Sequence, residues 1–127
     1  MKVICGIFVI LILITFSNCK ESDPIPNKVK NVKYEITGNF TGKLLIIYTD
    51  ISGGNKTLFN VSVPWSQEVT YPESVAAIGI GGQATVTGSV GQTVLVKIFV
   101  DGIEVKSSPA SAGSLGELVL PSIAYSF

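Results

Sequence analysis

Apolar side chains occupy every second position through much of residues 31–127, and this period of two constrains the fold more than any other feature. It is clearest in two sets of three residues: Val32, Tyr34 and Ile36, and Leu44, Ile46 and Tyr48. Successive side chains of a β-strand point to opposite faces, so each set predicts a strand with one apolar face. Residues 31–127 contain no segment with helical periodicity, which favours an all-β domain.

The strongest hairpin signal is the dipeptide Asp101-Gly102, which lies between two apolar segments. This dipeptide is preferred in two-residue type I′ turns. Such a turn pairs Val100 with Ile103 and Ile98 with Val105, so we expect all four side chains on one face.

A second hairpin is predicted in residues 43–66. Its turn is the segment 50–55, because glycine and asparagine accept positive φ and Asp and Ser bond their own backbone. In the strand after this turn, Phe59, Val61 and Val63 are expected to share one face.

The whole pattern amounts to about seven or eight short strands with turn signals every ~8–12 residues. Residues 107–116 are mostly small, which predicts a loop before the last strand. The sequence therefore predicts an immunoglobulin-like antiparallel β-sandwich over residues 31–127.

The first 30 residues have a different character. The apolar run from Val3 to Phe16 follows Met1-Lys2 and is shorter than the ~20 residues of a membrane-spanning helix. It predicts a signal peptide over residues 1–18, although an uncleaved N-terminal anchor helix remains an alternative. Residues 19–30 contain two prolines and predict an extended tether.

Cys19 follows Phe16-Ser17-Asn18, where a bacterial lipoprotein signal places the cysteine that becomes acylated. Loss of residues 1–18 would also remove Cys5, and the remaining cysteine cannot form an internal disulfide. Two or three acyl chains hold a protein on a membrane almost permanently, because each buried CH₂ contributes about 0.8 kcal/mol. We therefore expect lipidation at Cys19 and a place in the cell envelope, on the periplasmic or cell-surface face of the outer membrane.

Charge and residue types exclude several functions. The nine basic residues are all lysines, they balance nine acidic residues, and the chain has no histidine. Nucleic-acid binding needs a basic face that this chain lacks. Histidine is the commonest general base and metal ligand, and the sequence has no G-x-S-x-G elbow. We expect no nucleic-acid partner, no catalytic residues, no metal and no cofactor.

The segment Gly79–Ala84 fits a G-x-G-x-x-G/A pattern, which in dinucleotide-binding proteins precedes a helix. Here Thr85, Val86 and Thr87 follow, and they favour a strand or loop. The segment therefore does not predict a nucleotide site.

Some apolar residues lie on the outward faces of their predicted strands, where polar residues are expected. They are Leu45, Ile47, Leu58, Leu95 and Phe99. If they cluster, they form an interaction patch for a protein partner or a lipid chain. Alternatively, a loop or another strand covers them, or they are scattered over both sheets.

Several segments resemble one protein family. They are VKYEITG, LLIIYTDISGG, VSVPWS, VKIFVDGIEVKSS and SIAYSF, within Val29 to Phe127. On these segments the chain resembles the MmpS-like transport accessory proteins, in particular their lipoprotein branch in Gram-negative bacteria. The resemblance implies an extracytoplasmic β-sandwich on a membrane anchor. Because mycobacterial members assist large exporters of lipids or siderophores, it also implies an envelope protein or exporter as partner.

The expected function is a lipid-anchored, non-catalytic interaction or transport-accessory module of the cell envelope. The alternative is a surface-exposed lipoprotein that binds glycans or small ligands. In that alternative, the aromatic rings of Phe40, Trp65 and Tyr71 would stack on sugar rings. A hydrolase is the weakest hypothesis, because histidine, arginine and a nucleophile motif are all missing.

Overall fold

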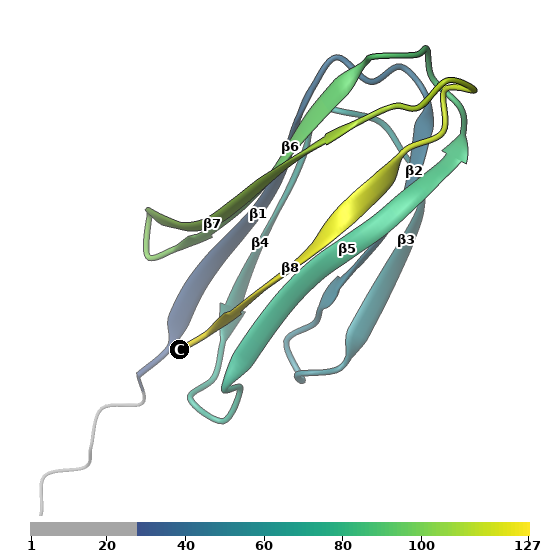
Figure 1. The fold of residues 1–127 in the computed structure, drawn as a ribbon. Coiled ribbons are helices and arrows are strands. Elements are labelled where there is room, and N and C mark those ends of the chain that lie inside the picture. The colour runs from purple at the N-terminus through teal and green to yellow at the C-terminus, as the bar shows by residue number, and fades with distance from the viewer. Residues whose placement is uncertain (1–27) are drawn as a thin grey trace, which may run out of the picture.

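The computed structural model describes residues 28–127, which form eight antiparallel strands in two four-stranded sheets (Figure 1). One sheet has the strand order β4-β1-β6-β7 and the other has the order β3-β2-β5-β8. The strands are β1 (Lys30–Gly38), β2 (Lys43–Thr49), β3 (Asn55–Val61), β4 (Trp65–Tyr71), β5 (Ala77–Val86), β6 (Thr93–Val100), β7 (Ile103–Ser111) and β8 (Val119–Ser126). The predicted all-β sandwich of seven or eight strands is confirmed. The predicted signal peptide lies outside the described residues.

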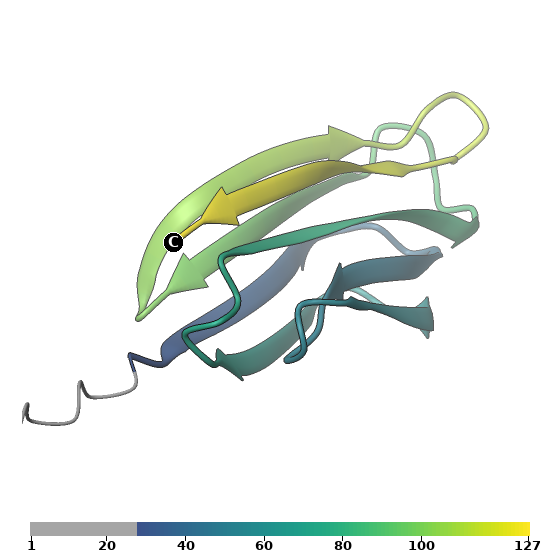
Figure 2. The same cartoon turned by 90° about the horizontal axis from the view of Figure 1, so that it is seen from below.

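The two sheets close against each other along one side. Strands β7 and β8 belong to different sheets, yet they pack side by side (Figure 2). On the other side, β3 and β4 are the edge strands of their sheets. The β2–β3 and β6–β7 hairpins each stay within one sheet, and the other connections cross between the sheets.

The sandwich has two ends with different sets of loops (Figure 1). We call the end where the chain enters at Lys28 the base. The base also contains the β2–β3 turn, the β4–β5 loop, the β6–β7 turn and the end of β8. We call the opposite end, formed by residues 39–42, 62–64, 87–92 and 112–118, the distal end.

The core lies between the sheets and contains the side chains that the alternation predicts. The buried residues include Val32, Tyr34 and Ile36 of β1, Leu44, Ile46 and Tyr48 of β2, Ile78 and Ile80 of β5, and Val94, Val96 and Ile98 of β6. The predicted inner faces of β1 and β2 are therefore confirmed. Each large apolar side chain stabilises the fold by about 1.5–3 kcal/mol when it is fully buried.

The β2–β3 hairpin departs from the prediction at a β-bulge. Leu44 pairs with Val61, but Ile46 pairs with Leu58, so β3 contains one extra residue at this point. Asn60 lies in the bulge with φ of 55°. An extra residue reverses the alternation along the strand. Leu58 therefore packs against the core and Phe59 is exposed, so the prediction that Phe59 shares a face with Val61 is wrong.

The β6–β7 hairpin has the predicted turn. Asp101 and Gly102 both have positive φ, 49° and 81°, as a type I′ turn requires. Val100 pairs with Ile103 as predicted.

The strand after this turn differs from the prediction in two respects. A bulge pairs Ile98 with Lys106 instead of Val105, and Ile103 is exposed rather than on the inner face. Strand β7 then continues to Ser111, so the first part of the predicted loop is a strand. Pairing with β6 stabilises this small-residue segment in spite of its low intrinsic preference for strand.

A buried hydrogen-bond network joins the two sheets near the base. The Tyr71 hydroxyl of β4 donates to the backbone carbonyl oxygen of Thr49, which is on β2 in the other sheet. A hydroxyl has one proton, so the Tyr34 hydroxyl donates to the Tyr71 oxygen, at 2.6 Å. The Gly79 N–H of β5 donates to Thr49 Oγ1 at 2.9 Å. The network therefore connects β1, β4, β2 and β5 inside an apolar core.

Removing the Tyr71 hydroxyl tests the contribution of this network to stability. The Tyr71→Phe variant leaves the Tyr34 hydroxyl and the Thr49 carbonyl without this buried partner, so we expect its free energy of unfolding to fall by about 1–3 kcal/mol. Urea denaturation measures the change. The control is Tyr125→Phe on the rim of the core, which we expect to change stability by less than about 0.5 kcal/mol. Equal losses in the two variants would contradict the network's role.

The same two tyrosines predict how stability depends on pH. Burial raises the pKa of both Tyr34 and Tyr71 above the ordinary value of 10.0, because an ionised phenolate loses its hydration. The unfolded chain releases these protons above pH ~10, whereas the folded chain keeps them. The stability from neutral tyrosine is therefore complete below about pH 9, begins to be lost as the pH rises above ~10, and continues to be lost until the pH passes the raised pKa of the folded tyrosines. Urea midpoints measured between about pH 8 and 12 should decrease as the pH rises above ~10. The decrease should be smaller for the Tyr34→Phe variant.

Candidate functional site

The described residues contain three surfaces to consider as functional sites. They are the outer faces that carry the predicted patch, a groove along β5, and the loops at the distal end. The predicted lipidation residue, Cys19, lies outside the described residues.

The structure does not bring the five predicted patch residues together. Leu45 and Ile47 lie on the outer face of the sheet β3-β2-β5-β8, whereas Leu95 and Phe99 lie on the outer face of the other sheet. These two faces point in opposite directions. Leu58 is turned into the sandwich by the bulge in β3. Alternation assigns a residue to a face of its strand but does not assign the strand to a sheet, so the predicted patch is divided.

The half-buried ring of Phe99 is partly covered by lysine side chains. Lys33 Nζ lies 4.4 Å from the ring centroid and Lys97 Nζ lies 5.9 Å from it. Such cation–π contacts stabilise by about 0.5–1 kcal/mol at exposed sites. Lys33 also pairs with Glu35 at 3.1 Å, and Lys97 pairs with Glu104 at 3.8 Å. This outer face is therefore a charged surface around one aromatic ring and not an apolar patch.

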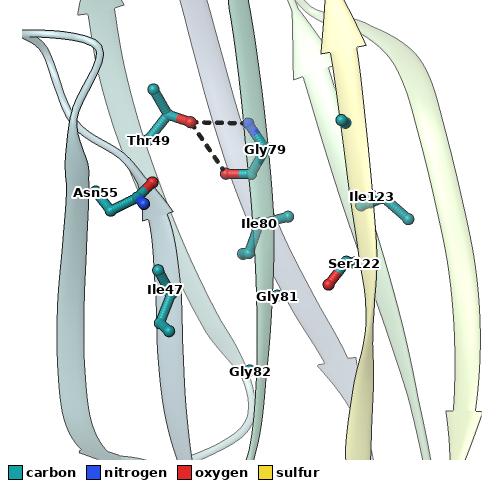
Figure 3. A pocket seen from close by; sticks show the side chains of 10 residues that line it. Ile47, Thr49, Asn55, Gly79, Ile80, Gly81, Gly82, Ser122 and Ile123 are labelled. Carbon is teal, nitrogen blue, oxygen red and sulfur yellow. Dashed lines mark hydrogen bonds between the residues drawn. The ribbon is translucent and has the colours of Figure 1, made fainter.

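A groove of about 330 Å³ follows β5 on the outer face of the sheet β3-β2-β5-β8 (Figure 3). Gly79 and Gly81 form its floor, Ile47 of β2 lies on one side and Ser122 of β8 lies on the other. At Gly82, φ is 152° and a Cβ atom would collide with the carbonyl oxygen of Leu45. The missing side chains of β5 thus create the groove.

The groove suits only a small apolar group. Its lining contains hydroxyl and amide groups but no titratable side chain; it consists of Ile47, Thr49, Asn55, Gly79, Ile80, Gly81, Gly82, Ser122, Ile123 and Ala124. General acid–base chemistry needs a titratable group within reach of the substrate. The Thr49 hydroxyl is already bonded to the Gly79 backbone, as Figure 3 shows. The groove lining therefore contains no side chain that could act as a general acid or base.

The segment Gly79–Ala84 has a structural role. It lies within β5 and continues as strand to Val86, so it lacks the helix N-terminus that holds a pyrophosphate. Among residues 28–127, no three side chains of His, Cys, Asp or Glu come together as metal ligands would.

Asp50 is a turn-forming residue, as its sequence context predicts. Its Oδ1 atom accepts hydrogen bonds from the backbone N–H of Ser52 at 2.9 Å and from that of Gly54 at 3.1 Å. The Ser52 hydroxyl, followed by these N–H groups, holds the pKa of the Asp50 carboxyl below its usual value. The carboxylate therefore closes the β2–β3 turn.

Of the three aromatic residues considered for sugar stacking, two are not free to stack and the third is only partly accessible. Phe40 and Tyr71 are buried, and Trp65 is half-buried against the core with its ring 6.0 Å from that of Tyr48. A glycan platform needs exposed ring faces. These three residues therefore do not support the glycan-binding alternative.

The distal end presents exposed apolar residues that the sequence analysis did not identify. They are Val86, Val90, Leu115 and Val119. Val90 is 68% exposed and Leu115 is 81% exposed, and each is in a Gly-Ser-apolar-Gly segment, at residues 88–91 and 113–116. The last glycine of each segment has a similar positive φ, 78° at Gly91 and 75° at Gly116. We call Val90 and Leu115 the distal pair.

Backbone hydrogen bonds hold the two loops of the distal pair together. The Gly88 N–H donates to the Gly116 carbonyl at 2.9 Å, and the Gly91 N–H donates to the Ala112 carbonyl at 3.1 Å. Gln92 Oε1 also accepts bonds from the backbone N–H of Ser89 and of Thr41, which attaches the loop 39–42 to the same unit. The distal pair is therefore held on an ordered support.

The sequence signal for this surface is a Gly-Ser-apolar-Gly segment. Glycine and serine together favour a turn, where burial of the apolar residue is uncommon. Two such segments of the same pattern therefore indicate two exposed apolar tips.

Comparison with known proteins supports the resemblance to MmpS-like proteins at the level of the family, and the lipoprotein branch stays a prediction. Residues 2–113 match the model of a family described as Mycobacterium membrane protein, and this match covers most of the chain. A search of curated proteins finds no match. In residues 28–127 there is no helix with the length and apolar character needed to cross a bilayer. From the family match, the chain belongs to the Mycobacterium membrane protein family, whose members are MmpS-like membrane-associated proteins of the cell envelope.

Proposed function

We propose that this protein is a lipid-anchored β-sandwich of the cell envelope that acts, without catalysis, as an interaction or transport-accessory module. Membership of a membrane-protein family supports the location. The position of Cys19 after an apolar leader supports the lipid anchor. The distal pair is the single structural observation that supports the interaction role.

The distal pair lies at the end of the molecule away from the chain's entrance. Strand β5 has 10 residues, and at ~3.3 Å per residue it separates the two ends by about 30 Å. An anchored protein would therefore hold Val90 and Leu115 some distance from the membrane surface. That position suits contact with another envelope protein.

The chemistry of the distal pair favours a protein partner. Exposed Val and Leu side chains offer no hydrogen bonds, and each contributes about 1.5–3 kcal/mol when fully buried against another surface. Energy in protein interfaces is concentrated in a few such buried contacts. The MmpS-like relatives assist exporters, so we propose an exporter or an associated envelope protein as the partner.

Charge substitutions in the distal pair test the interaction role. We expect Val90→Asp or Leu115→Asp to reduce recovery of a defined partner from envelope extract by about tenfold or more, since a loss of 1.4 kcal/mol changes affinity tenfold. Quantitative pull-down with the mature domain measures recovery. Phe59→Asp is the control, because Phe59 is equally exposed but lies on β3. If the unmodified domain recovers no defined protein at several salt concentrations, the interaction role is contradicted.

Substitution of Cys19 tests the anchor separately. We expect Cys19→Ser to abolish acylation and to move the protein from the membrane fraction to the soluble fraction, because the acyl chains supply the membrane affinity. Mass spectrometry of the native protein should give an N-terminal acylated cysteine at position 19. A mature chain that begins at Met1 with unmodified Cys19 would contradict lipidation and support the anchor-helix alternative.

A further inference from the structure

We infer that the base of the sandwich is a membrane-docking surface that rests on a bilayer of zwitterionic phospholipid. The inference depends on the membrane anchor of the proposed function and adds an orientation to it. Three observations support it: the length of chain between Cys19 and the sandwich, the exposed apolar residues at the base, and the charges around them.

The chain length brings the base close to the membrane. Lys28 is nine residues after Cys19, and nine residues span at most about 30 Å when fully extended. The sandwich itself is also about 30 Å long, from the strand rise. The base can therefore reach the bilayer whatever the conformation of the tether, whereas docking of the distal end would require nearly full extension.

The base carries exposed apolar side chains from four separate segments. They are Val29 before β1, Ile51 in the β2–β3 turn, Ile103 after the β6–β7 turn and Phe127 after β8. Figure 1 shows these four segments at the end of the sandwich where the chain enters. Polar residues usually occupy turns and the strand ends beside them, so Ile51 in its turn and Ile103 at the start of β7 are unusual in a surface that faces only water.

The charges of the base are mixed rather than of one sign. A hollow of about 480 Å³ at the base is lined by Lys28, Glu73, Asp101 and the Phe127 ring, among others. Lys30 Nζ lies 4.3 Å from the centroid of the same ring. A zwitterionic headgroup has a phosphate group and an ammonium group. The lysine side chains of the base match the phosphate in charge, and the acidic side chains match the ammonium group. The surface does not need an excess of anionic lipid, in contrast to a polybasic segment.

The outer faces of the sheets are less suitable for contact with lipid. One face carries the ion pairs of Lys33 with Glu35 and Lys97 with Glu104, whose hydration would be lost. The other face is hollowed by the β5 groove, beside which Ile47 is exposed.

A modest apolar surface is sufficient because the protein is already attached. A short flexible linker gives an effective concentration on the order of millimolar. The base therefore docks from the tether even though the free domain would bind vesicles weakly.

Depth-dependent quenching tests the orientation in the full lipidated chain. Ile103→Trp and Val90→Trp place the probe at the base and at the distal end, on residues that are both 68% exposed. Trp65 is present in both variants and gives the same background. In phosphatidylcholine vesicles with brominated acyl chains, we expect at least about twofold stronger quenching for Ile103→Trp, since interfacial apolar side chains reach the acyl boundary.

Second substitutions make the test specific for the base. Adding Ile51→Asp to Ile103→Trp should lower the quenching toward that of Val90→Trp. Adding Val86→Asp, a change at an exposed residue of the distal end, should leave it unchanged. Replacing part of the phosphatidylcholine with phosphatidylglycerol should also leave the difference unchanged.

Vesicle flotation distinguishes failure of docking from failure of the anchor. A chain that floats with the vesicles but shows equal quenching at both positions, or stronger quenching at Val90→Trp, overturns the docking surface and leaves the anchor intact. Strongest quenching in an Ile47→Trp variant also overturns it, since the sheet face would then contact lipid. A chain that does not float overturns both the anchor and the docking surface.

Discussion

The hydrogen bond from the Tyr71 hydroxyl to the Thr49 carbonyl oxygen connects the two sheets inside an otherwise apolar core. Apolar packing alone lets two sheets slide over each other, because it has no direction. A buried donor with a single acceptor fixes their relative position, since any shift leaves a polar group unpaired. Thr49 extends this constraint to Gly79, so one network sets both the spacing of the sheets and the wall of the β5 groove.

Much of the fold could be predicted because it follows from one physical rule, the alternation of side chains between the two faces of a β-strand. Alternation identified the buried faces of β1 and β2, and Asp101-Gly102 identified the type I′ turn. The same rule failed at the bulge near Asn60, because one extra residue reverses the alternation without a distinctive sequence. Alternation also could not assign β2 and β6 to different sheets, because that assignment depends on contacts between residues far apart in the sequence.

The functional surfaces were harder to predict than the core. An apolar residue at an outward position of a strand is conspicuous because it breaks the alternation, whereas an apolar residue in a loop has no such pattern to break. Most of the exposed apolar residues lie at the two ends of the sandwich, Val90 and Leu115 at one end and Ile51 and Ile103 at the other. Under the proposed anchoring, the two ends have different surroundings, so similar chemistry would serve contact with lipid at one end and with protein at the other.

The bulge in β3 has a consequence for a protein that a membrane concentrates in two dimensions. β3 is an edge strand, and a straight edge offers a row of free N–H and C=O groups to a neighbouring copy. The bulge at Asn60 bends that row, and Pro109 interrupts the corresponding row on the edge strand β7. The bulge thus hinders crowded copies from joining their sheets through β3.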